Sequence, residues 1–129
     1  MTKTVLDLTP EELESYRPAI VIRMRQKNLD AQTEKRWRQA RRLALKATNL
    51  LRHEFGAEKV LLFGSAVHRS WFTLWSDIDL AAFDIAPGRF FAAVAAVTGL
   101  SPDFKIDLVD PETCSASLRS VIERDGVEL

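Results

Sequence analysis

Two aspartates two positions apart, Asp77 and Asp79, carry the strongest chemical signal in the chain. Asp79 lies inside an apolar run, residues 78–83, whose length and composition predict a buried strand. Side chains alternate along a strand, so both carboxylates point to the same face. Two like charges buried side by side are unfavourable unless cations neutralise them. The simplest such cation is Mg²⁺, which carboxylates hold together with phosphate oxygens.

A glycine turn precedes these aspartates. Gly64-Ser65 directly follows a second apolar run, residues 60–63, which also predicts a strand. Glycine lets the backbone approach a ligand closely, and free N–H groups at a helix start favour phosphate. By itself the dipeptide fits a plain turn better. Combined with Asp77 and Asp79 at this spacing, it predicts a phosphate-binding turn beside a metal site.

A third carboxylate, Asp107, falls within another predicted strand. Residues 104–109 alternate, with Ile106 and Leu108 on one face and Lys105, Asp107 and Val109 on the other. A carboxylate in mid-strand is unfavourable unless it has a role there. A structural role remains open, in which Asp107 pairs with Lys105 or a nearby arginine.

The turn and the paired aspartates belong to one longer pattern, Phe63-Gly64-Ser65, a spacer, and Ser76-Asp77-Ile78-Asp79-Leu80. This pattern resembles the signature of the DNA polymerase β-like nucleotidyltransferase superfamily. It is most similar to the minimal nucleotidyltransferase (MNT) antitoxins that are paired with HEPN-domain toxins. The resemblance covers about residues 33–129.

The resemblance implies a site with two Mg²⁺ ions and ATP as substrate. Asp77, Asp79 and Asp107 match the family's three carboxylates, so they are the implied catalytic and metal-binding residues. The implied nucleotide-binding residues are Gly64, Ser65, Ser76 and Arg69.

The spacer departs from the family pattern. It carries His68-Arg69-Ser70 where many relatives have Arg followed by Gly, and it is one residue longer. It also holds three aromatic residues, Trp71, Phe72 and Trp75. These could stack on a base, bury against a partner protein, or fill the local core.

The family's activity, carried over, is transfer of AMP to a hydroxyl side chain, typically tyrosine, of a HEPN ribonuclease toxin. Two alternatives remain. The chain could be a non-catalytic antitoxin that covers its partner, with the aromatic loop and the basic helices as interface. It could also be an aminoglycoside-type nucleotidyltransferase that modifies a small molecule. The altered spacer keeps the non-catalytic alternative open.

Composition limits the other classes. Eighteen basic and eighteen acidic residues balance to zero in a chain of 129 residues, so we expect neither direct nucleic-acid binding nor membrane binding. A homo- or hetero-oligomer remains possible. The single cysteine, Cys114, excludes an internal disulfide and suits a reducing compartment. Without a signal-peptide pattern at the N-terminus, we expect a cytoplasmic protein.

The expected fold is α/β (α+β), a nucleotidyltransferase fold. Its mixed sheet has about four strands, and its helices pack mainly on one face. Residues 1–30 form an N-terminal helical extension, and residues 31–129 form the minimal nucleotidyltransferase domain.

Within the extension, a helix begins at Thr9-Pro10. Pro18 is expected to kink this segment or divide it in two. The polar residues 26–32 read as a connection, and a second helix covers about residues 31–55. The basic face of that helix is either solvated or a surface for an acidic partner or nucleotide phosphates.

Further along, Pro87 begins a helix that Gly99 ends, and Asp110-Pro111 begins the last helix. The closing residues 125–129 resemble the tail of MNT proteins, which implies a short last strand that completes the sheet.

Overall fold

A computed structural model describes residues 9–129, with the side chains of residues 12–17 left out of the description. The chain divides into two compact units, residues 1–32 and 33–129, which we treat separately. Along residues 9–129, no helix is long and apolar enough to cross a membrane.

The first helix is longer than the sequence predicts. α1 (Pro10–Phe55) begins at the predicted proline but neither divides at Pro18 nor opens into a connection at residues 26–32. An interior proline costs about 3 kcal/mol because it removes one backbone hydrogen bond, and this cost falls on one turn of a 46-residue helix. Five of the seven residues 26–32 are Gln, Lys, Leu or Ala, which are good helix formers. There the Gln26 amide also donates to the Asp30 carboxylate at 3.1 Å.

Four strands form one mixed sheet, as predicted, and their order is β3-β2-β1-β4. Their bounds are β1 (Lys59–Phe63), β2 (Ile78–Phe83), β3 (Ile106–Val109) and β4 (Val127–Glu128). β1 is antiparallel to β2 and β4, whereas β2 and β3 are parallel. The short last strand pairs Val127 with Leu62, so the C-terminus does complete the sheet.

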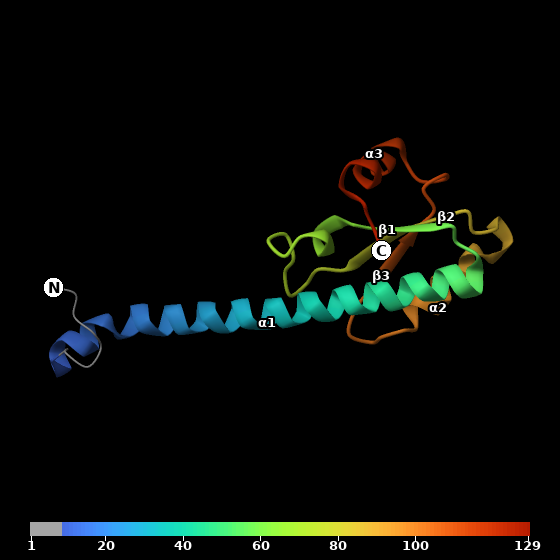
Figure 1. Cartoon of the computed structure of the whole chain (residues 1–129). Coiled ribbons are helices and arrows are strands. Elements are labelled where there is room, and N and C mark those ends of the chain that lie inside the picture. Colours follow the sequence, from blue (N-terminus) through green and yellow to red (C-terminus); the bar gives the residue numbers. More distant parts are fainter. Residues whose placement is uncertain (1–8) are drawn as a thin grey trace. The chain divides into compact units, whose positions relative to one another are not determined.

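Helices cover the two faces of the sheet unequally (Figure 1). The C-terminal half of α1 and α2 (Phe90–Thr98) lie on one face, and α3 (Ala116–Asp125) lies on the other. Even-numbered strand residues point to the α1 and α2 face, where they join the larger core: Val60, Leu62, Ile78, Leu80, Ala82 and Ile106. Odd-numbered residues point to the α3 face, where Phe63 and Ala81 pack with Ile122. The prediction that helices pack mainly on one face is confirmed.

An apolar stripe on α1 is the surface that covers the sheet. Three alanines, Ala40, Ala44 and Ala47, are fully buried together with Leu51. Such small side chains let the helix backbone come close to the strands, so few large residues are needed to fill this core. Thr48 is the buried polar residue there, and its hydroxyl donates to the Ala44 carbonyl at 2.8 Å.

The last helix begins later than predicted. Asp110 does not cap it; its carboxylate accepts from the Glu112 N–H at 2.9 Å and so closes a local turn. α3 starts at Ala116 instead, where the Ser115 hydroxyl accepts from the Leu118 N–H at 3.2 Å. The predicted helix after Pro87 is confirmed, with a 3₁₀ turn, η3 (Pro87–Arg89), before α2.

We expect Ser115→Ala to destabilise the protein by about 1 kcal/mol, because the substitution leaves a helix N–H without its cap. Urea unfolding followed by circular dichroism measures this. Ser120→Ala is the matched control, because Ser120 lies inside the same helix and its hydroxyl bonds back to the Ala116 carbonyl. That control should be close to neutral. Equal losses in the two variants would contradict the assigned cap.

Candidate active site

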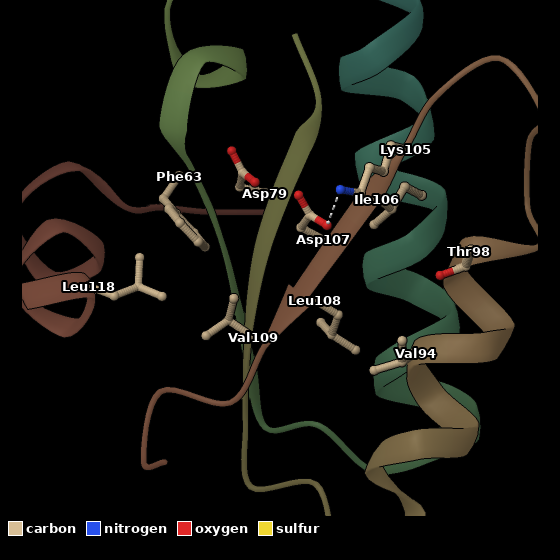
Figure 2. Close-up of a pocket in the computed structure, with 10 residues that line it drawn as sticks. All are labelled: Phe63, Asp79, Val94, Thr98, Lys105, Ile106, Asp107, Leu108, Val109 and Leu118. Atoms are coloured by element: carbon tan, nitrogen blue, oxygen red, sulfur yellow. Dashed lines mark ion pairs between the residues drawn. The ribbon is translucent and has the colours of Figure 1, made fainter. Parts of the chain in front are cut away.

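Asp79 and Asp107 lie side by side on the α3 face of the sheet (Figure 2). They are paired in the register of the parallel strands β2 and β3, so both side chains leave the same face of the sheet. Asp77 directly precedes β2 and acts electrostatically on Asp79. The structure therefore brings the Asp-x-Asp motif and Asp107, far apart in sequence, to one place.

Gly64 lies against the Asp79 carboxylate. Phe63 pairs with Asp79 across β1 and β2, and the chain then turns into the 3₁₀ helix η2 (Gly64–Val67). Gly64 has a φ of 73°, and a Cβ built on it would overlap Asp79 Oδ2. Both facts require glycine here. The predicted glycine turn thus lies directly beside Asp79, the second predicted carboxylate.

Burial, and after it the neighbouring Asp107 and Asp77 charges, raise the pKa of Asp79 to about 6. The Lys105 ammonium acts in the opposite direction. A carboxyl whose charged form is disfavoured by its like-charged neighbours is typical of functional sites. The site is therefore rich in negative charge that a bound cation would stabilise.

Lys105 is the positive group of this site. Its Nζ lies 3.6 Å from Asp107 Oδ1, so the structural pairing that the sequence left open does occur. Within residues 9–129, no three His, Cys, Asp or Glu side chains lie close enough together to hold a metal ion as they stand. The donor chemistry of the three aspartates fits Mg²⁺, which takes carboxylate oxygens and completes its shell with water and phosphate. Their roles as metal ligands and catalytic residues stay predictions.

A cavity of about 500 Å³ runs along β3. All of Lys105–Val109 lines it, with Asp79 at the polar part. Phe63 and Leu118 contribute apolar wall on the α3 side, and Val94 and Thr98 contribute the α2 side. Phe63 and Leu118 give no sequence signal as cavity-lining residues, because their apolar character also fits ordinary core.

Side chains of α1 hold the glycine turn in place. Trp37 Nε1 donates to the Ala66 carbonyl at 3.0 Å, and Arg41 donates to the Val67 carbonyl at 3.3 Å. Arg36 contacts a different loop: it donates to the Asp103 carbonyl at 2.9 Å, and its guanidinium lies over the Phe104 ring. Two arginines of the basic face, Arg36 and Arg41, are thus half-buried and bind carbonyls of this same domain.

The remaining predicted nucleotide-binding residues have partners in the protein. Arg69 donates to Glu34 of α1 at 2.7 Å. The Ser76 hydroxyl accepts from the Thr73 N–H at 2.9 Å and so closes a turn in the spacer. Ser65 lies within η2, half-buried. Phosphate binding by these residues stays a prediction, and Glu34 gave no sequence signal because it lies 35 positions from Arg69.

The three spacer aromatics have different environments. Phe72 is 3% exposed and fills the core. Trp71 is half-exposed and packs edge-on to His68, with ring centroids 4.2 Å apart. Trp75 is 84% exposed on the turn that Ser76 closes. Core filling is therefore correct for Phe72 and wrong for Trp75.

We expect Gly64→Ala to damage both the turn and the carboxylate site. The new methyl group meets Asp79, and the left-handed backbone costs about 1 kcal/mol for alanine. The melting temperature should fall and Mg²⁺ binding, measured calorimetrically, should be lost. Gly88→Ala is the control, because a Cβ at Gly88 meets nothing within 4 Å. Full Mg²⁺ binding by Gly64→Ala would contradict the close approach.

Asp79→Asn should raise the melting temperature of the metal-free protein at pH 7.5. The folded pKa of about 6 lies above the ordinary aspartate pKa of 3.8, so the folded state binds a proton more tightly than the unfolded state. The wild type therefore loses stability as pH rises from about 4 to 6, and asparagine removes this loss. Melting curves at several pH values test it. The gain should vanish below pH 4, and a gain that persists there would contradict the assignment.

No protein-family model matches the sequence, and no curated protein matches it. Two toxin–antitoxin complexes are among the solved structures that share its fold. A chain of the toxin–antitoxin complex MntA–HepT superposes with a TM-score of 0.51 at 22% identity, over 68% of this chain and 69% of that one. A chain of the complex between a tri-AMPylated Shewanella oneidensis HEPN toxin and its MNT antitoxin superposes with a TM-score of 0.51 at 22% identity, over 69% and 70%. With its mixed sheet, glycine turn and paired aspartates, this protein has the minimal nucleotidyltransferase fold.

Proposed function

We propose that this protein transfers AMP from ATP to a hydroxyl side chain, typically tyrosine, of a HEPN-type toxin and thereby neutralises that toxin. The observation that carries the proposal is the Asp79–Asp107 pair held against the Gly64 turn. Carboxylates beside backbone N–H groups that can receive phosphate are the parts that nucleotidyl transfer needs.

Each residue has a separate task in this proposal. Asp77, Asp79 and Asp107 would hold two Mg²⁺ ions, which when bound neutralise the charge of the triphosphate and of the attacking oxygen. Gly64 and Ser65 bind the β- and γ-phosphates through their N–H groups and the Ser65 hydroxyl. Asp107 helps to take the proton of the acceptor hydroxyl. The acceptor oxygen then bonds to the α-phosphorus, the α–β phosphoanhydride bond breaks, and pyrophosphate leaves.

The cavity along β3 supports an aromatic acceptor. Phe63, Val109 and Leu118 provide apolar wall, while Asp107 lies at the polar part of the same cavity. A tyrosine side chain matches this cavity, because its apolar ring can lie against the apolar wall while its hydroxyl reaches the carboxylate. An aliphatic hydroxyl would leave this wall uncovered.

The partner is proposed from the solved structures that share the fold. One is a complex of MntA with HepT, and the other contains a tri-AMPylated HEPN toxin with an MNT antitoxin. A HEPN toxin is therefore the first acceptor to test, with ATP as the AMP donor.

A non-catalytic antitoxin is the second candidate, and two observations favour it. Trp75 is 84% exposed, and an exposed indole is a frequent anchor of protein interfaces. Arg69, the predicted phosphate ligand, is bound to Glu34. In that case the chain would silence its partner by covering it. The small-molecule alternative stays a prediction that no observation favours.

The test is intact-mass spectrometry of a co-expressed HEPN partner with ATP and Mg²⁺. The wild type should add mass in whole AMP units, and Asp77→Ala/Asp79→Ala should add none because it removes two proposed metal ligands. Asp103→Ala is the control, because its exposed side chain lies on a loop outside the site. A stable complex that silences the partner without any mass gain would disprove AMP transfer and favour the non-catalytic antitoxin.

A further inference from the structure

We propose that Lys105 is the resident counter-cation of the carboxylate site, that Mg²⁺ must displace it, and that it then binds the nucleotide's phosphates. This inference rests on the proposed metal site. It assigns a role to Lys105, which lies outside the sequence pattern that resembles the family. Its basis is the position of Lys105 relative to Asp79 and Asp107.

Lys105 directly precedes β3, and its ammonium points to Asp107 of that strand. The ammonium is 3.6 Å from Asp107 Oδ1, and Asp79 is the direct neighbour of Asp107 in the register (Figure 2). All three residues line the same cavity. The backbone of Lys105 is fixed to β2, because its carbonyl accepts from the Ile78 N–H at 2.9 Å. The positive charge is therefore attached rigidly at its base and directed at the site.

The head of the side chain is free to move. The Lys105 side chain is 69% exposed and that of Asp107 is 42% exposed. An exposed pair of this kind contributes little to folding stability. Lys105 nevertheless lies beside two neighbouring carboxylates, Asp107 and Asp79. Its positive charge offsets the repulsion between them in the metal-free protein. The Lys105–Asp107 ion pair thus involves one of the carboxylates of the site.

Metal and lysine then exclude each other near Asp107. A cation that binds Asp107 repels the ammonium, so Lys105 weakens the binding of Mg²⁺ alone. The flexible four-carbon stem lets the ammonium swing away within the same cavity. Once the triphosphate is bound, the displaced ammonium faces new negative charge and strengthens the binding of the nucleotide. Lys105 thus couples metal loading to the presence of the nucleotide.

Displacement of Lys105 by Mg²⁺ and its later binding to phosphate predict opposite changes in the two affinities of Lys105→Gln. Isothermal titration calorimetry should show Mg²⁺ alone binding about threefold to tenfold more tightly than to wild type, since one repelling charge is gone. With saturating Mg²⁺, α,β-methylene-ATP should bind more weakly by a similar factor. Lys105→Arg keeps the charge and should stay close to wild type in both titrations.

Lys59→Gln is the matched control. Lys59 lies on the same face of the sheet and loses the same charge, but it pairs with Phe83 at the other end of β1, away from Asp79. Its ammonium lies over the Phe83 ring, 4.4 Å from the centroid. This variant should change neither affinity.

Two outcomes would overturn the inference. One is a Lys105→Gln variant that binds Mg²⁺ alone no more tightly than wild type does. The other is an unchanged affinity for the nucleotide analogue. A purely structural salt bridge would lower the melting temperature and would not shift the affinities in opposite directions. Because neither titration needs an acceptor or turnover, opposite shifts without AMP transfer would refute the proposed function alone, whereas AMP transfer without the shifts would refute the role of Lys105 alone.

Discussion

The adjacency of Asp79 and Asp107 is the constraint on which the rest of this site depends. Like charges directly opposite each other in a sheet are destabilising, and the parallel register of β2 and β3 places these two side by side. Burial raises the pKa of Asp79, and the Asp107 charge contributes to the same rise. A fold under no demand from function would fill these two positions with apolar residues, as it does two positions further along each strand, at Ala81 and Val109.

The surroundings of this pair are organised to hold it in position. Gly64 brings the backbone against Asp79, where a side chain would not fit. Trp37 and Arg41 of α1 then fix the turn through the carbonyls of Ala66 and Val67. The predicted binding residues therefore lie on a turn and on strand ends, which a rigid helix and sheet support. Catalytic sites are usually arranged in this way. The basic residues that could suggest a binding surface serve in part to build this support.

The sequence by itself determined most of the fold. Strand positions follow from apolar runs and alternation, because a side chain's face is set by its place along the strand. The same rule put Asp77 and Asp79 on one face and Asp107 on another strand facing the same way. It failed where polar residues carry two competing signals. Asp110 is as suitable for a local turn as for a helix cap, and the polar residues 26–32 are as suitable for a helix as for a loop.

The tertiary structure alone decided which partners these residues meet. Strand order is not written in any local pattern, so only the folded sheet shows Asp107 beside Asp79 and leaves β4 at the far edge. The pairing of Arg69 with Glu34 is likewise invisible in sequence, because nothing local to either residue specifies a contact 35 positions away. Residue type and spacing thus determined which groups could do chemistry here. The long-range pairing of strands and the packing of α1 decided which of them face one another, because those contacts are selected by the burial of the whole core.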